Sequence, residues 1–326
     1  MQKTAMLTGW VLFIILLSIT SIISQDNLDN TIQETVPDPK VYFCKTDNCS
    51  ERLAYLIMTA ENSVHCAFFD LDLKNIMDTL ADKSGYVDVK IVIDNDNYEG
   101  IKSNVVYDDS KQYMHNKFCI IDRKIVWTGS FNPTFRGNNM NDNNAVVVFS
   151  RGLAVNYESE FDELWNRRFG SGDRTNNADF IINNISISSY FCPEDKCSLR
   201  IINELRKAKQ SIYFMTFSFT HEGIADSILL SRAADIKGIF EKSQGGSRYS
   251  MYSRLKGFGI DVVKDSNPYN MHHKVFIIDN RTVITGSFNP TKNGDENNDE
   301  NILIIRDKGI AEEFLDEFER VLGEGD

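Results

Sequence analysis

The sequence of 326 residues has no excess of basic residues and contains only five histidines. With 35 Lys and Arg against 47 Asp and Glu, its formal net charge is −12. Non-specific binding to nucleic acid or anionic lipid relies on clustered cations, so this charge opposes such adsorption and leaves room only for a small local basic site. The hydrophobic content of 42% is that of a folded globular protein, and the length suits one large core or two domains.

The six cysteines are also informative by what they lack. Cys44 and Cys49 form one C-x4-C pair and Cys192 and Cys197 another, without the C-x2-C spacing or nearby His partners of common zinc sites. These pairs are candidates for a short disulfide in each half, with four ordinary thiols as the alternative. The remaining two lie in apolar, strand-like runs, and we expect them to be buried and inert: Cys66 and Cys119.

Charged residues are absent between Lys3 and Asp26, and the apolar run WVLFIILL occupies positions 10–17. A segment of this length (1–25) can span a bilayer or serve as a secretory signal. Because no clean Ala-x-Ala cleavage site is present, an uncleaved membrane anchor is slightly favoured over a signal peptide. Either reading places the rest of the chain, which begins with a polar tether at 26–40, outside the cytoplasm.

The chain contains an internal duplication. The segment MHNKFCIIDRKIVWTGSFNPT begins at Met114, and MHHKVFIIDNRTVITGSFNPT begins 157 positions later at Met271. The cysteine pairs repeat at a spacing of 148, so the second half has nine additional residues between these landmarks. Helical periodicity alternates with apolar strand patterns in both halves. We therefore predict an α/β fold with an N-terminal hydrophobic helix and two duplicated units at 41–169 and 189–326, joined by a linker at 170–188.

Polar residues recur at identical offsets in the two segments, although strand packing requires only the apolar ones. They are His115, Lys117, Asp122, Gly129, Ser130 and Asn132, and His272, Lys274, Asp279, Gly286, Ser287 and Asn289. Residues two apart on a strand point to the same face, so each half brings an imidazole, an ammonium, a hydroxyl and an amide together. Such donors suit a phosphoryl group, and an imidazole suits attack on phosphorus or protonation of a leaving oxygen.

Both segments resemble in full the HxKx4Dx6GSxN signature of the phospholipase D superfamily, and the resemblance covers about residues 41–325. The short units look more like the compact nuclease-type members than the long classical phospholipases. The resemblance implies two α/β/α sandwich units packed about a pseudo-two-fold axis and a phosphodiesterase that needs neither metal nor cofactor. It implies that one His forms a phosphohistidine and the other protonates the leaving group. The implied roles are catalysis for His115 and His272, phosphate binding for Lys117, Lys274, Asn132 and Asn289 with support from Ser130 and Ser287, and a structural turn for Asp122 and Asp279.

In nuclease-type relatives a Glu eleven residues after the motif Asn orients the catalytic His. This chain has Glu300 at that place in the second half and Asn143 in the first. A carboxylate stabilises an imidazolium, whereas an amide does not. If each residue orients the His of its own half, His272 is the protonated general acid and His115 the neutral nucleophile.

The leading interpretation is an extracytoplasmic nuclease, membrane-anchored or secreted, with nucleic acid as its substrate. The strongest alternative is a membrane-associated phospholipase D-type lipid hydrolase, which the N-terminal segment favours; two intact motifs argue against an inactive phosphate-binding module. A basic stretch with two tyrosines at 242–256 either contacts a phosphate backbone or is an ordinary solvated loop. Because one chain carries both motifs, a monomer is sufficient for a complete site.

Overall fold

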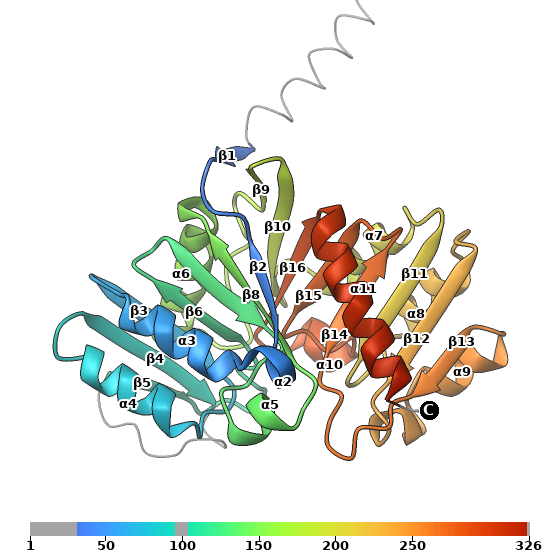
Figure 1. Cartoon of the computed structure of the whole chain (residues 1–326), viewed down its shortest axis with the longest axis horizontal. Helices are drawn as coiled ribbons and strands as arrows, with labels where there is room; N and C mark the ends of the chain where they lie inside the picture. Colours follow the sequence, from blue (N-terminus) through green and yellow to red (C-terminus); the bar gives the residue numbers. More distant parts are fainter. Residues whose placement is uncertain (1–30, 95–103, 325–326) are drawn as a thin grey trace, which may run out of the picture.

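The computed structural model describes residues 31–94 and 104–324 as an α/β fold with two mixed β-sheets, which confirms the predicted fold class (Figure 1). The predicted N-terminal anchor or signal at 1–25 lies outside the described residues. Within the described ranges, no helix is long and apolar enough to cross a bilayer.

The first half forms a seven-stranded sheet in the order β2-β8-β7-β6-β3-β4-β5. Helices cover both faces, so its central strands are buried throughout. Its strands are β2 (Lys40–Phe43), β3 (Ser63–Phe68), β4 (Asp88–Asp94), β5 (Val105–Asp108), β6 (Lys117–Ile121), β7 (Ile125–Gly129) and β8 (Asn144–Phe149). Its helices are α2 (Cys44–Asp47), α3 (Cys49–Met58), α4 (Lys74–Lys83), α5 (Phe135–Asn139) and α6 (Arg151–Trp165).

The second half forms a nine-stranded sheet in the order β1-β9-β10-β16-β15-β14-β11-β12-β13. Its strands are β1 (Ile32–Glu34), β9 (Asp179–Ile182), β10 (Ile185–Cys192), β11 (Ser211–Thr216), β12 (Asp235–Phe240), β13 (Asp261–Lys264), β14 (Lys274–Ile278), β15 (Thr282–Gly286) and β16 (Glu300–Arg306). Its helices are α7 (Cys197–Leu205), α8 (Glu222–Leu229), α9 (Tyr252–Gly257), α10 (Lys292–Glu296) and α11 (Lys308–Gly323). The additional residues of this half include α9, between β12 and β13.

One apolar core joins the halves. Alternate residues of the first sheet, such as Phe118 and Ile120 on β6, pack into the same cluster as Leu153 on α6 and Phe314 on α11. The opposite faces of the two sheets form separate clusters with their own helices, α3 and α4 in the first half and α7 and α8 in the second. The halves are therefore held together by a shared hydrophobic layer.

The segment before the first unit also connects the two sheets. Residues 32–34, within the predicted tether, form β1 and pair in parallel with β9, which lies within the predicted linker. A few residues later, β2 pairs antiparallel with β8 of the other sheet. Residues 32–43 thus contact both halves.

The two repeated segments have the same local fold. β6 and β14 each begin at the motif Lys, and β7 and β15 each end at the motif Gly. Gly129 and Gly286 have φ of 145° and 149°, and a Cβ on either would lie 2.4 or 2.2 Å from a backbone oxygen of the neighbouring strand. Only glycine fits these two positions. Both turns therefore bring the residues after the glycine to the same place relative to the His-Lys strand.

Candidate active site

Residues of both halves line one cleft of about 710 Å³. Its lining includes His115 and Asn132 from the first repeat and His272 and Asn289 from the second. Short backbone bridges hold the halves together beside the histidines: His115 N donates to Asp299 O, and His272 N donates to Asp142 O, each at 2.9 Å. The two motifs thus share one site.

Each motif histidine, His115 and His272, is oriented by a residue of the opposite half. His115 Nδ1 lies 2.8 Å from Glu300 Oε2, and His272 Nδ1 lies 2.9 Å from Asn143 Oδ1. The prediction that Glu300 orients His272 and Asn143 orients His115 is therefore wrong. The reason is geometric, because β8 and β16 begin at the interface between the halves, where Asn143 and Glu300 face the partner repeat.

The partners fix which ring nitrogen is available. Asn143 Nδ2 donates to Gly137 O at 3.0 Å, so its Oδ1 accepts from His272 Nδ1. A carboxylate on Glu300 likewise accepts from His115 Nδ1. In both rings Nε2 is left for chemistry in the cleft.

Two buried lysines lie behind the histidines. Lys117 Nζ donates to His115 O at 2.6 Å, and Lys274 Nζ donates to His272 O at 2.8 Å. Burial lowers the pKa of Lys117 to about 7 against the opposing effect of Glu300. Burial and the charge of Lys117 also lower the pKa of Lys274 well below its usual value.

The same positive charges act on the imidazoles. Burial, followed by Lys117 and Lys274, lowers the pKa of His115, and burial with the same two lysines lowers that of His272. Burial raises the pKa of Glu300 to about 8, against the lowering effect of the lysines. A bound anion would offset these like-charge interactions, so the site is suited to a negatively charged group.

Asn132 and Asn289 lie at the cleft with part of their hydrogen-bonding capacity unused. The Oδ1 atom of each is buried and has no hydrogen-bond partner among the described residues. The carbonyl groups of both residues accept from the threonine two positions later, which holds the turns closed. Two carboxamides therefore flank the histidines in matching positions.

The motif serines act behind the cleft. Ser130 Oγ donates to Asn143 Oδ1 at 3.1 Å, and Ser287 Oγ donates to Glu300 Oε2 at 2.7 Å. Both side chains are fully buried and neither lines the cleft. In this structure both hydroxyls hold the residues that orient the histidines. Their expected support of the phosphate stays a prediction.

The motif aspartates bind backbone amides away from the cleft. Asp122 Oδ1 accepts from the amides of Glu61, Asn62 and Ser63. Asp279 repeats this arrangement with the amides at 209–211. These contacts join the turn after the His-Lys strand to the start of the neighbouring strand, in line with the structural role expected for both.

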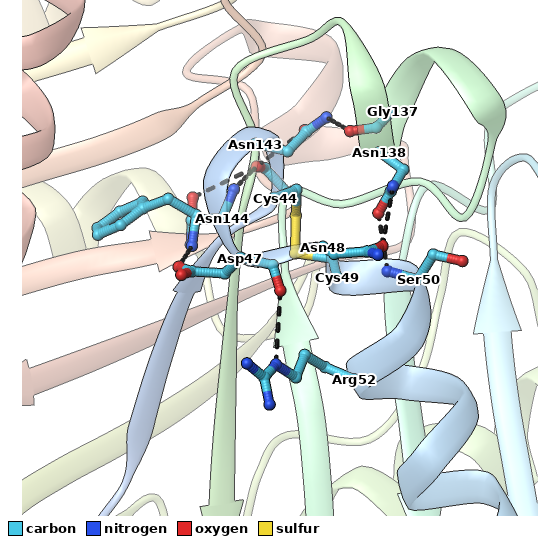
Figure 2. Close-up of a disulfide and its surroundings, with 12 residues drawn as sticks. Cys44, Asp47, Asn48, Cys49, Ser50, Arg52, Gly137, Asn138, Asn143 and Asn144 are labelled. Atoms are coloured by element: carbon cyan, nitrogen blue, oxygen red, sulfur yellow. Dashed lines mark hydrogen bonds between the residues drawn. A yellow bond between two sulfur atoms is a disulfide. The ribbon is translucent and has the colours of Figure 1, made fainter.

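The disulfides Cys44–Cys49 and Cys192–Cys197 are present, as the spacing indicates. The first lies beside an orienting residue, since Cys44 N donates to Asn143 O at 2.9 Å (Figure 2). In the same loop, Asn138 Oδ1 accepts from Ser50 N and Asn138 Nδ2 donates to Asn48 Oδ1. In the second half, Cys192 is the register partner of Glu300.

Cys66 and Cys119 are buried as expected but are joined by a third disulfide, so the expectation that they are inert is corrected. They are register partners on the adjacent antiparallel strands β3 and β6, with Cα atoms 4.1 Å apart. The corresponding pair in the second half is Phe214 and Phe276. Three disulfides indicate an oxidising, extracytoplasmic compartment.

Sequence reasoning missed two aromatic residues at the site. Phe69 packs edge-on to His115 and Phe217 packs edge-on to His272, each with ring centroids 4.8 Å apart. The lysine ammonium groups lie 5.0 and 5.1 Å from the same two rings. The signal was available, because both phenylalanines follow equivalent strands at the spacing of 148 shown by the cysteine pairs.

The basic stretch at 242–256 lies outside the cleft lining. Arg254 pairs with Asp226 at 2.5 Å, Lys256 Nζ donates to Tyr252 OH, and Lys242 N donates to Asp265 Oδ1.

Comparisons with known proteins agree with this geometry. The sequence profile of a family described as "Cardiolipin synthase, PLD-like domain" matches residues 53–165 and 201–322. Phospholipase D of Rickettsia typhi is 34% identical over 132 residues, which are 40% of this chain and 65% of that protein. The chain spans about 64–66% of the length of the first curated relatives it matches.

Two solved structures are also similar. The phospholipase D family member Nuc from Salmonella typhimurium is 31% identical, with 43% of this chain and 95% of that chain covered and a TM-score of 0.41. Phosphatidylserine synthase from Haemophilus influenzae Rd KW20 is 13% identical, with 92% of this chain and 89% of that chain covered and a TM-score of 0.66. The second likeness extends over both sheets and shows a shared fold.

Proposed function

The chain belongs to the phospholipase D superfamily, and from that premise we propose that it is an extracytoplasmic nuclease, a phosphodiesterase that needs no metal and works through a phosphohistidine. The observation that carries the proposal is the pair of histidines on one cleft, each oriented through Nδ1 by the opposite half. Asn132 and Asn289 flank the histidines, and Lys117 and Lys274 lie behind them. We propose that these four residues hold the phosphate. The proposal includes a role for the N-terminal segment at 1–25, which either anchors the chain in a membrane or directs its secretion.

In the first step, His115 Nε2 attacks phosphorus, the bond to the leaving oxygen breaks, and His272 donates its Nε2 proton to that oxygen. In the second step, water attacks the phosphohistidine, and His272 takes a proton from the water as the P–N bond breaks. Protons and bonds balance over the cycle, and both histidines return to their starting states.

The assignment of roles follows from charge. Attack changes His115 from a neutral ring to a cationic phosphoimidazolium; the developing positive charge favours the ionised form of Glu300, and the carboxylate in turn stabilises that charge. His272 loses a positive charge in the same step, and the neutral Asn143 amide imposes no penalty on this loss. The expected argument, in which the carboxylate-paired histidine is the acid, would now make His115 the acid. The change of charge in the first step instead supports His115 as nucleophile and His272 as acid. Burial and the two lysines lower the pKa of His272, and a bound diester offsets the effect of the lysines, which favours protonation of His272.

A phospholipid is the alternative substrate, and the name of the Rickettsia relatives, phospholipase D, favours it. The lining of the cleft favours nucleic acid, since it contains no aliphatic side chain among the described residues. Acyl chains bind aliphatic grooves, whereas sugars and bases bind amides, hydroxyls and aromatic rings.

The test offers the purified full-length chain single-stranded DNA, duplex DNA, RNA and phospholipid vesicles, all in EDTA. We expect cleavage of nucleic acid that a variant with both His115→Ala and His272→Ala lacks. Hydrolysis of vesicles with no cleavage of any nucleic acid would establish the lipid alternative. Activity that disappears with EDTA and returns with a divalent cation would contradict the mechanism.

A further inference from the structure

The rim of the cleft has two sides, here called its lips, one formed around Tyr113 of the first half and the other around Asn270 of the second. The two lips have equivalent backbones but different side chains. Tyr113 N donates to Asn298 Oδ1 and Tyr113 O accepts from Asp299 N, at 3.3 and 3.0 Å. Asn270 makes the same two bonds with Asn141 Oδ1 and the Asp142 amide, at the same distances. The two positions are therefore structural equivalents that carry a phenol ring in one half and a carboxamide in the other.

At a second pair of equivalent positions, the first half again has an aromatic residue and the second half does not. Thr134 and Thr291 cap the short helices α5 and α10 through equivalent bonds to Gly137 and Gly294. The residue that follows is Phe135 in the first half and Lys292 in the second. Phe135 lines the cleft, whereas Lys292 does not and instead pairs with Glu296.

The aromatic rings of the first half lead from the lip to the nucleophile. Tyr113 packs edge-on to Phe69 at 5.4 Å, and Phe69 packs edge-on to His115 at 4.8 Å. Tyr113 and Phe135 are nevertheless 46% and 56% exposed, although both are large rings. Arg136, next to Phe135, also lines the cleft, and its equivalent in the second half is Asn293.

Exposed rings beside a phosphodiester site, together with a guanidinium, form the combination that binds single-stranded nucleic acid. A base stacks on an aromatic ring whatever its sequence, and an arginine contacts a neighbouring phosphate. A paired base cannot stack in this way, because its faces are covered within the duplex. The second lip offers the amides and hydroxyl of Asn270, Thr291 and Asn293, which suit hydrogen bonds to a sugar or a base edge.

Building on the proposed nuclease function, we propose that Tyr113 and Phe135 form a stacking platform for one base next to the scissile phosphate, on the side of the first half only. The nuclease therefore acts on single strands, and it depends on the base on one side of the cut much more than on the base on the other side. Tyr113 and Phe135 determine this specificity and take no part in bond making.

The experiment uses the full-length chain and short single-stranded DNA in which one residue is a tetrahydrofuran abasic site. The rates of cleavage at the two phosphates that flank the abasic site are compared with the rates at the same phosphates in the unmodified strand. We expect kcat/KM to fall about tenfold or more at one flanking phosphate and little at the other, since stacking of one base is lost. Equal losses at both phosphates, or no loss at either, would overturn the proposal.

Variants test whether Tyr113 and Phe135 cause the difference in rate at the abasic site. Tyr113→Asn and Phe135→Lys introduce the residues of the second half, and we expect the ratio of unmodified to abasic rates to fall toward one. Tyr113→Phe keeps the ring and should keep the ratio. Tyr269→Asn is the matched control, because Tyr269 is 44% exposed but lies outside the cleft lining. A ratio that survives both Tyr113→Asn and Phe135→Lys would overturn the platform.

The outcomes separate this inference from the proposed function. If single strands are cleaved without any dependence on a flanking base, the proposed nuclease function holds and the proposed stacking platform is wrong. If an activated diester is cleaved but no nucleic-acid strand is, both the nuclease function and the stacking platform are wrong. If Tyr113→Asn lowers hydrolysis of phosphatidylglycerol vesicles and leaves strand cleavage unchanged, the lip serves a lipid surface and the inference is wrong.

Discussion

Glu300 Oε2 lies 2.8 Å from Nδ1 of His115, a residue 185 positions away in the other half. The corresponding contact of His272 is with the neutral amide of Asn143. The two histidines therefore have equivalent positions but different electrostatic partners, and several measurable differences follow.

The first prediction separates the histidines. His115→Ala should abolish hydrolysis of every diester, because no covalent intermediate can form. His272→Ala should abolish cleavage of oligonucleotides but retain activity on a nitrophenyl diester, whose leaving group needs little help from an acid. The two variants are compared on both substrates over a range of pH. The reverse pattern would show that the roles are exchanged.

The second prediction concerns the orienting residues. Glu300→Gln keeps a hydrogen-bond acceptor for His115 but removes the charge that stabilises the phosphoimidazolium, so kcat should fall about 10²–10³-fold on both substrate types. Asn143→Asp places a carboxylate on His272 and makes it a weaker acid, so it should slow oligonucleotide cleavage more than nitrophenyl release. Equal effects of Asn143→Asp on the two substrates would count against the assignment of His272 as acid.

The third prediction uses inorganic phosphate as a probe of the buried cations. Phosphate should raise the melting temperature and inhibit competitively, because an anion relieves the repulsion between Lys117 and Lys274. Lys274→Met should lose most of this stabilisation. Lys292→Met is the control, since Lys292 is exposed outside the cleft. An equal rise in melting temperature with phosphate in both variants would indicate that phosphate binds at another site.

The fourth prediction is a pH dependence of stability. The pKa of Lys117 is near 10.5 in the unfolded chain and about 7 in the folded one, so between these values only the unfolded chain holds the proton. Stability from this residue therefore rises with pH across that window, with a slope approaching about 1.4 kcal/mol per pH unit. Because Glu300 acts in the opposite sense below about pH 8, urea unfolding is measured from pH 8 to 10. The slope in the wild type should exceed that of Lys117→Met; equal slopes would contradict the lowered pKa.

The fifth prediction concerns the disulfide beside Asn143. Replacing Cys44 and Cys49 together by Ala should cost about 2 kcal/mol of stability, as expected for a short closed loop. It should also slow oligonucleotide cleavage more than nitrophenyl release, because the loop positions the partner of the acid His272. The matched variant replaces Cys192 and Cys197, beside Glu300, and should slow both reactions. Losses in stability alone, with unchanged kcat in both variants, would reduce the disulfides to a purely structural role.

The repeated offsets in the sequence predict the two histidines and two asparagines that meet at the cleft, but not the aromatic residues Phe69 and Phe217. His115 and His272 follow from them because polar identity at fixed spacing has no explanation in strand packing. The same comparison does not reveal which half orients which histidine, since nothing in the sequence states that β8 and β16 begin at the interface. For a related reason the sequence does not reveal that Ser130 and Ser287 contact Asn143 and Glu300, because a shared strand face does not distinguish the cleft from the layer behind it.

The Cys66–Cys119 disulfide illustrates a different limit. Burial of both residues follows from their apolar surroundings, but their pairing depends on the register of two strands that are 53 residues apart. Register between distant strands is decided by the packing of the whole sheet. The short C-x4-C pairs need no such information, because their loops are closed locally.

The crossed orientation has a consequence for what duplication makes possible. Two identical halves assembled by rotation would give both histidines the same partner, either two carboxylates or two amides, and the site would be indifferent to the direction of its substrate. Fusion into one chain allows position 143 and position 300 to diverge independently, and the same holds for Tyr113 and Asn270. A symmetric scaffold can in this way become a directional one, in which a strand enters with a defined polarity and is always attacked from the same side.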